Sequence, residues 1–121
     1  MSTVTLYGLR QCDTCRRAMR WLDANAVAYH WVDIREKTPA THVLSTWIDA
    51  VGISTLVNRR STTWRTLDAA TRDLLDDTTA PELLRQHPTL IKRPVLAVDK
   101  AVSVGFDEAD WRARLPGLAD T

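Results

Sequence analysis

Apolar residues at the start of the chain follow the period of a strand, then of a helix, then of a strand. The short run 3–7 (TVTLY) predicts the first strand, and 28–34 (AYHWVDI) predicts the second. Between them, one face of a helix within 13–26 would pack on the sheet, because apolar residues recur there at helical spacing: Cys15, Ala18, Met19 and Leu22. Two strands joined by a helix should be parallel, with a right-handed crossover.

The middle of the chain has helical rather than strand periodicity. Thr38 and Pro39 are typical of a helix start, with the threonine as cap and the proline at the first helical position. Gly52 would end this helix. Because this part of the chain lacks predicted strands, we expect 37–90 to be a helical insertion within a single domain, 1–121.

Two further helices are expected in this insertion. One would cover 68–76, with Leu74 and Leu75 facing inward, and one would run from Thr79 to His87. The basic stretch 58–65 (NRRSTTWR) is expected to be a surface loop.

The last third returns to strand patterns. The apolar runs 95–98 and 101–104 flank the two-residue turn Asp99-Lys100, which predicts an antiparallel hairpin. Asp107 would then cap a final helix. The resulting order is β-α-β, helical insertion, β-β-α. We therefore predict an α/β fold of the thioredoxin-like, glutaredoxin type.

The segment Cys12-Asp13-Thr14-Cys15 carries the clearest chemistry. It lies between the first predicted strand and the first helix, which is the layout of a thioredoxin-like redox motif. A sulfur at a helix start lies beside free N–H groups that stabilise a thiolate. We therefore expect Cys12 to be the nucleophile. Arg16 would add positive charge nearby.

Cys15 has two open interpretations. It lies one turn further on, where a thiol can attack a mixed disulfide at Cys12 and resolve it. It also lies on the apolar stripe, where it could simply pack in the core. Half of a zinc site is a third use of two cysteines at this spacing. The remaining candidate ligands are three isolated histidines without ligand spacing, so we expect no metal.

The net charge and the lengths of the apolar runs limit the compartments and the kinds of partner to expect. The net charge of +1 gives no general reason to expect binding to DNA or to an anionic membrane. No apolar run approaches the ~20 residues that span a bilayer, and no secretory signal pattern is visible at the N-terminus. We expect a cytoplasmic protein, in which paired cysteines are catalytic more often than structural.

Arg60 and Arg93 fall where chain segments should converge on the cysteine loop. An arginine offers a planar fork to an oxyanion. The anion could be arsenate, a carboxylate of glutathione or the thiolate itself. Pro94, just before the third strand, stands where the thioredoxin-like fold has a cis-proline opposite the cysteines, although most X-Pro bonds are trans.

Three segments make the chain resemble the ArsC/Spx family of glutaredoxin-like arsenate reductases and their relatives, most closely its YffB-like branch. The similarity covers nearly the whole chain. The matching residues are Tyr7-Gly8 with Cys12 to Ala18, Asn58 to Leu67, and Ile91-Lys92-Arg93-Pro94-Val95-Leu96, with Gly105-Phe106 near the end.

The resemblance implies a reactive Cys12, an anion-binding Arg93 and a cis Pro94. Arsenate reductases of this type surround the cysteine with three arginines and work with glutathione and glutaredoxin. Here Asn58 stands at one of these positions, with Arg60 as a displaced substitute, and Phe106 stands near another. Fewer oriented cations weaken the case for arsenate as substrate.

We therefore expect a thiol–disulfide reductase with glutathione as co-substrate, glutaredoxin or thioredoxin as further partners, and no tightly bound cofactor. The expected catalytic residues are Cys12, Cys15 and Arg93, and the expected anion-binding residues are Arg60, Arg93, Pro94 and Arg16. Two alternatives stay open. One is a true arsenate reductase. The other, implied by the Cys-x-x-Cys switch of Spx-type proteins, is a redox-controlled regulator that binds RNA polymerase.

Overall fold

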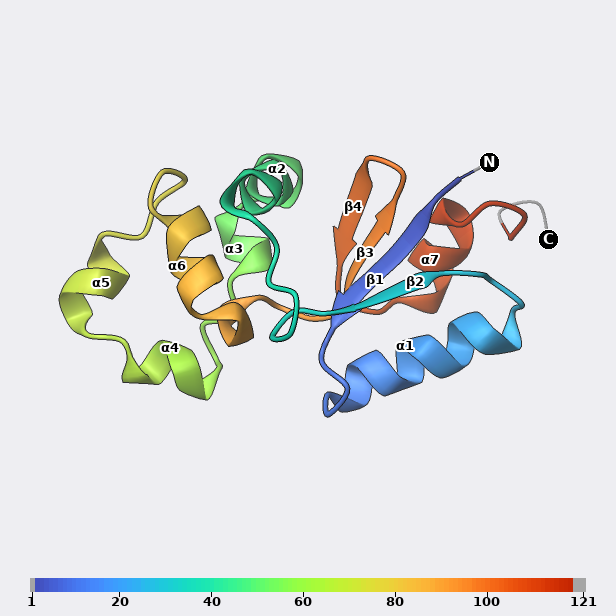
Figure 1. The fold of residues 1–121 in the computed structure, drawn as a ribbon, viewed down its shortest axis with the longest axis horizontal. Coiled ribbons are helices and arrows are strands. Elements are labelled where there is room, and N and C mark those ends of the chain that lie inside the picture. The colour runs from blue at the N-terminus through green and yellow to red at the C-terminus, as the bar shows by residue number, and fades with distance from the viewer. Residues whose placement is uncertain (1, 119–121) are drawn as a thin grey trace. The chain divides into compact units, whose positions relative to one another are not determined.

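The computed structural model describes residues 2–118 and divides the chain into two compact units. The first contains the two ends of the chain, up to Asp33 and from Arg93. The second is the continuous segment Ile34–Lys92, close to the predicted insertion 37–90. The expectation that both belong to a single domain stays a prediction, and each unit is described here by itself (Figure 1).

The first unit is built on a four-stranded mixed sheet. Its strands are β1 (Val4–Gly8), β2 (His30–Asp33), β3 (Val95–Val98) and β4 (Ala101–Val104), in the order β2-β1-β3-β4. β1 pairs in parallel with β2 and antiparallel with β3, and β3 pairs antiparallel with β4. Both the predicted parallel pair and the predicted hairpin are confirmed, and with them the thioredoxin-like fold.

Helices α1 (Asp13–Ala24) and α7 (Glu108–Arg114) cover the same face of this sheet. Alternate residues of β1 point to that face, where Leu6 lies opposite Leu96 of β3. A single apolar cluster joins the strands to both helices: Val4, Leu6, Ala18, Leu22, Leu96, Val98, Trp111 and Leu115. The predicted inner face of α1 is confirmed, since Cys15, Ala18 and Leu22 are fully buried.

Asp99 closes the hairpin between β3 and β4. It takes a left-handed conformation with φ of 53°, which an aspartate tolerates better than most residues. Its carboxylate accepts a hydrogen bond from the N–H of Thr3 at 2.8 Å, and its own N–H donates to the Thr3 carbonyl at 2.8 Å. The turn is thereby tied to the start of β1.

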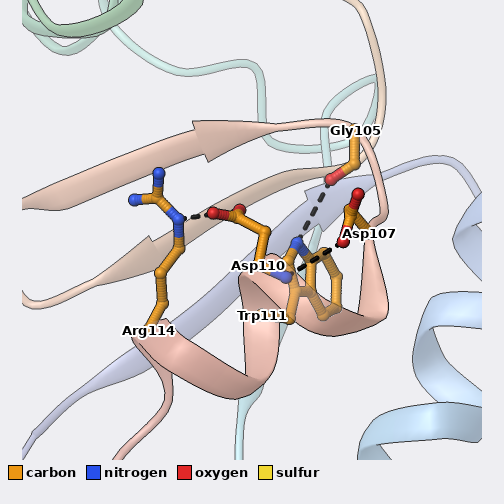
Figure 2. A network of polar contacts seen from close by, with 5 residues as sticks. All are labelled: Gly105, Asp107, Asp110, Trp111 and Arg114. Carbon is orange, nitrogen blue, oxygen red and sulfur yellow. Dashed lines mark hydrogen bonds and ion pairs between the residues drawn. The ribbon is translucent and has the colours of Figure 1, made fainter. Parts of the chain in front are cut away.

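Polar contacts fix α7 at its beginning (Figure 2). Asp107 caps the helix as predicted, because its carboxylate accepts a hydrogen bond from the N–H of Asp110 at 2.9 Å. The indole N–H of the buried Trp111 donates to the Gly105 carbonyl at 3.2 Å. One turn after Asp110, Arg114 forms an ion pair with its carboxylate, with 2.8 Å between Nε and Oδ2. These contacts join the helix to the strand end that precedes it.

The second unit is helical. It contains α2 (Thr41–Val51), α3 (Ile53–Leu56), α4 (Thr62–Thr66), α5 (Ala69–Asp73), α6 (Ala80–Gln86) and the 3-10 helix η1 (Pro88–Leu90). α2 packs against α6. The buried side chains include Leu44, Trp47, Ile48, Leu56, Leu84 and Leu90. None of the helices formed by residues 2–118 is long and apolar enough to cross a lipid bilayer.

Three expectations for this unit are wrong. α2 begins at Thr41 rather than at Thr38, whose hydroxyl donates to the Ile34 carbonyl at 2.7 Å and so serves the preceding turn. Leu74 does not face inward: α5 ends at Asp73, and Leu74 is 68% exposed. The stretch 58–65, expected to be a loop, contains the start of α4, because the Ser61 hydroxyl accepts a hydrogen bond from the N–H of Trp64 and caps a short helix.

Candidate active site

Cys12 lies directly before α1, as the motif predicts. It is the N-cap residue, and its carbonyl accepts the first helical hydrogen bond, from the N–H of Arg16 at 3.0 Å. Its side chain is partly exposed and is not joined to Cys15 by a disulfide. A thiol in this place is accessible to a substrate and lies at the positive end of a 12-residue helix.

The surroundings of Cys12 favour the thiolate. Burial alone would raise its pKa, but hydrogen bonds from the N–H and thiol of Cys15 and from Arg93, together with the Arg93 charge, outweigh this effect. The net pKa of Cys12 is lowered from its ordinary value. A lowered pKa increases the fraction of the reactive form near neutral pH.

Cys15 has the opposite environment. It is fully buried on the inner face of α1, and the pKa of its thiol is raised to about 12, chiefly by burial and further by the hydrogen bond and the negative charge at Cys12. Cys15 therefore stays protonated next to the Cys12 thiolate and donates to it. Cys12 is thus the anion of the pair, and Cys15 is its hydrogen-bond donor.

Gly8, at the end of β1, makes room for the Cys15 sulfur. A Cβ atom on Gly8 would lie 2.5 Å from Cys15 Sγ and 3.1 Å from Cη2 of Trp31. Real Cβ atoms do not come as close to another atom as 2.5 Å, so only glycine fits here without displacement of the buried thiol. The sequence pattern shows Gly8 as part of a motif but does not reveal this close approach.

Arg93 and Pro94 lie at the entrance to β3, in the same unit as the cysteines. The peptide bond between them is cis, as predicted. Pro94 is buried, and its carbonyl accepts a hydrogen bond from the N–H of Gly105 at 2.8 Å. Pro94 is thereby tied to the residue that follows β4, and the neighbouring Arg93 donates a hydrogen bond to Cys12.

Arg16 is not among the groups that lower the pKa of Cys12. Its Nε donates to the Arg10 carbonyl at 2.8 Å, and its guanidinium pairs with Asp13 at 3.5 Å. The cation that acts on Cys12 is Arg93, from the far end of the sequence.

Arg60 lies in the second unit, in a basic cavity of about 410 Å3. Its backbone N–H donates to the side-chain carbonyl of Asn58 at 3.1 Å. A single antiparallel bridge pairs residue 57 with residue 91 and so places Lys92 at this cavity. Two backbone hydrogen bonds form it, from the N–H of Lys92 to the Leu56 carbonyl and from the N–H of Asn58 to the Leu90 carbonyl, both at 2.7 Å. The lining residues are Ser54, Val57, Asn58, Arg59, Arg60 and Lys92.

Lys92 and Arg59 also line this cavity, although their positions in the sequence do not predict it. Arg59 lies over the ring of Trp64, with 5.2 Å between the guanidinium carbon and the ring centroid. The pairing of residues 57 and 91 is a tertiary contact of single residues, too short to produce a strand pattern. The feature of the sequence that could have indicated this cavity is the cluster of basic residues around Arg60.

Within the described residues 2–118, no three metal-binding side chains lie together as His, Cys, Asp or Glu ligands would in a metal site. In the cysteine pair, contacts with Arg93 and between the two thiols set the protonation of each sulfur. What it offers is an accessible thiolate next to a protonated, buried second thiol.

A family model described as the ArsC family matches residues 7–114, which includes the cysteine motif and Arg93. The chain belongs to the ArsC family. This confirms the resemblance drawn from the sequence and makes the chain a member of a thiol-redox family.

Several known proteins are similar to this chain over most of their length. An uncharacterized protein from Haemophilus influenzae is 38% identical over 110 residues, which cover 91% of this chain and 96% of that protein. A global transcriptional regulator Spx from Streptococcus agalactiae is 30% identical over 117 residues, covering 93% and 83%. The solved structure of a protein named YffB is 39% identical, covers 92% of this chain and 97% of its own, and has a TM-score of 0.88.

Proposed function

We propose that this chain is a cytoplasmic thiol–disulfide reductase that uses glutathione, with Cys12 as nucleophile and Cys15 as resolving thiol. The observation that carries the proposal is the unequal pair of thiols. Cys12 is accessible with a lowered pKa, and Cys15 is buried with a pKa of about 12. A nucleophile followed by a protected second thiol suits a two-step exchange.

In the first step, the Cys12 thiolate attacks one sulfur of a substrate disulfide. A mixed disulfide forms at Cys12, and the other half of the substrate leaves as a thiolate. In the second step, Cys15 loses its proton to solvent and attacks Cys12 Sγ, which releases the second half of the substrate. Two molecules of glutathione then reduce the Cys12–Cys15 disulfide and leave as oxidised glutathione.

The first step also prepares Cys15 for the second. Once Cys12 is in a mixed disulfide, its negative charge no longer raises the pKa of Cys15. Burial, the larger cause, persists and keeps the thiolate fraction of Cys15 low. Glutathione can attack the mixed disulfide in its place, so the two routes to resolution compete.

Arg93 would have two tasks in this scheme. It stabilises the Cys12 thiolate before the attack, and its planar guanidinium can hold a carboxylate of glutathione beside the sulfur. Arg60 is a second candidate for such an anion, since its cavity contains three cationic side chains.

Treatment of Cys15→Ser protein with oxidised glutathione tests the proposal. Intact-mass measurement and peptide mapping should find one glutathione, attached to Cys12. The wild-type protein should instead form the Cys12–Cys15 disulfide, and Cys12→Ser should form neither. A folded Cys15→Ser protein that does not become glutathionylated at Cys12 contradicts the reductase proposal.

Turnover of a model disulfide with glutathione then separates the two interpretations of Cys15. A Cys15→Ser protein with much slower turnover identifies Cys15 as the resolving thiol. Undiminished turnover assigns resolution to glutathione and leaves Cys15 with a packing and hydrogen-bonding role.

Arsenate belongs in the same assay, with glutathione and glutaredoxin supplied. We expect little or no arsenate reduction. Phe106, near a position where the resemblance places an arginine, packs edge-on against Trp111, with ring centroids 4.8 Å apart, and supplies no charge. A rate that disappears in Cys12→Ser would restore arsenate as a substrate.

A regulatory function is the second candidate, because the similar protein from Streptococcus agalactiae is named a global transcriptional regulator. In that case, formation of the Cys12–Cys15 disulfide would control binding to RNA polymerase. Pull-down from a bacterial extract under reducing and oxidising conditions checks this. Recovery of polymerase subunits in neither state counts against it.

A further inference from the structure

Leu74 is an exposed apolar residue at a defined place in the second unit. Its side chain is 68% exposed, and among residues 2–118 no other large hydrophobic side chain is classed as exposed. It follows α5 directly and forms its C-cap. Single exposed leucines are common on protein surfaces, so the exposure acquires meaning only through what surrounds it.

Leu74 forms one wall of a groove between α5 and α6 (yellow and orange in Figure 1). The opposite wall is a face of α6, whose lining residues recur at helical spacing: Thr79, Glu82, Leu83 and Gln86. Thr71 completes the lining. We call these six residues the α5–α6 groove. Its volume of about 320 Å3 suits one or two apolar side chains.

Hydrogen bonds hold the two walls of the α5–α6 groove in place. The hydroxyl of Thr79 donates to the Leu74 carbonyl at 2.8 Å. The Asp76 carboxylate accepts from the N–H groups of Thr78 and Thr79, both at 2.9 Å. The Asp68 carboxylate accepts from the N–H of Thr71 at 2.7 Å. Leu74 therefore lies on a turn that is already ordered, so binding in the groove does not have to overcome the entropy cost of ordering this turn.

The segment 68–86, which contains all six groove residues, is acidic. It has five carboxylates and two guanidinium groups: Asp68, Asp73, Asp76, Asp77 and Glu82, with Arg72 and Arg85. The acidic side chains are exposed, and in the described part of the chain none of them forms an ion pair with a cation. Hydrogen bonds from Thr79 and Thr78 lower the pKa of Asp76, so its charge persists well below neutral pH.

We propose that the α5–α6 groove binds a basic amphipathic helix of a partner protein. One or two apolar side chains of that helix would enter the groove between Leu74 and Leu83. Lysine or arginine residues beside them would meet Glu82 in the groove and the other exposed carboxylates of 68–86. This is helix-in-groove recognition, in which apolar anchors supply affinity and charges supply orientation and specificity.

The sign of the charge selects this occupant. An anionic membrane and the phosphate backbone of a nucleic acid would both be repelled by the unpaired carboxylates. A second copy of this chain could offer its own basic segment around Arg59 and Arg60, and that outcome has to be separated by experiment. The proposal does not depend on the cysteine chemistry.

The test uses the full-length protein and fluorescently labelled synthetic helices. One peptide carries leucine on one face and lysine on the other; its two controls replace lysine by glutamate or leucine by serine. The leucine–lysine peptide should bind to wild type, more weakly as salt increases, and neither control should. Amide NMR shifts should change mainly within 68–86.

Leu74→Ser and Asp77→Asn/Glu82→Gln are the informative variants, because all three side chains are exposed and none of them forms a hydrogen bond that caps a helix. Each should weaken binding at least about tenfold, the usual cost of removing an interface anchor. Asp49→Asn, which removes an exposed carboxylate from α2, should bind as wild type does.

Three results would overturn the proposal. The first is equal binding of the leucine–lysine peptide to wild type and Leu74→Ser, with both folded by circular dichroism. The second is binding of the glutamate peptide as tight as that of the lysine peptide. The third is a wild-type dimer in sedimentation experiments that Leu74→Ser dissociates, which would assign the groove to a second copy.

Discussion

Two side chains decide whether Cys12 is a thiol or a thiolate: Cys15, from the same helix, and Arg93, from the last third of the chain. Both donate hydrogen bonds to the Cys12 sulfur, and Arg93 also supplies the charge. Burial of Cys12 acts in the opposite direction. The reactivity of this cysteine is thus a balance in which removal of a single donor should be measurable.

Replacement of Arg93 by methionine should raise the pKa of Cys12, because both a charge and a hydrogen bond to the thiolate are lost. The profile of alkylation rate against pH should move to higher pH, with a several-fold lower rate at neutral pH. Thiolate absorbance checks this directly, since Cys15, with a pKa of about 12, does not titrate in the same range. Arg20→Met, an exposed change on α1, should leave the profile where it is.

Gly8→Ala should destabilise the protein by about 1–3 kcal/mol, because the new methyl group would overlap the Cys15 sulfur. Urea denaturation measures the loss. In the double variant Gly8→Ala/Cys15→Ala, the loss should be smaller than the sum of the two single losses, since the overlap with sulfur is gone and only the Trp31 contact remains. Strict additivity would show that the two sites do not touch.

At the same scale, the sequence predicts some site residues better than others. Cys12, Cys15 and the Arg93-Pro94 pair follow from motif spacing and resemblance, and the structure brings them together. Arg16 looked equally suitable, but its guanidinium contacts the Arg10 carbonyl and Asp13 instead. Side-chain direction depends on local hydrogen-bond competition, which a position in the sequence does not encode.

At the scale of elements, the regular alternation of apolar residues predicts the first unit well. The bounds of β3 and β4 and the cap of α7 are as expected. The helical insertion is harder, since its helices α3 to α6 have four to seven residues and span too few turns for a clear period. There a single side-chain hydrogen bond, such as that of Thr38, moves a boundary.

Asp107→Ala should cost about 1 kcal/mol of stability, because the cap of α7 loses its acceptor for the Asp110 N–H. The contact is shown in Figure 2. Urea denaturation of Glu108→Ala provides the comparison: this neighbour is equally exposed but caps nothing, so its loss should be clearly smaller. Equal losses would mean that α7 is held by its packing alone.

At the scale of the whole molecule, the chain contains two compact units. Leu84 is fully buried on α6, and Leu84→Ala should destabilise its unit by about 2–5 kcal/mol. Hydrogen exchange should therefore speed up within 34–92 more than in β1 and β3. The alkylation rate of Cys12 should not change. Equal acceleration throughout the chain would show that the two units unfold as one.

The antiparallel pairing of β1 with β3 has a consequence for the protein during its synthesis. Cys12 leaves the ribosome early, whereas Arg93 emerges only after the whole helical insertion. Until β3 joins the sheet, the nascent chain carries Cys12 without its cation. Its reactivity would thus arise only late in folding, which limits the oxidation of an unfinished chain.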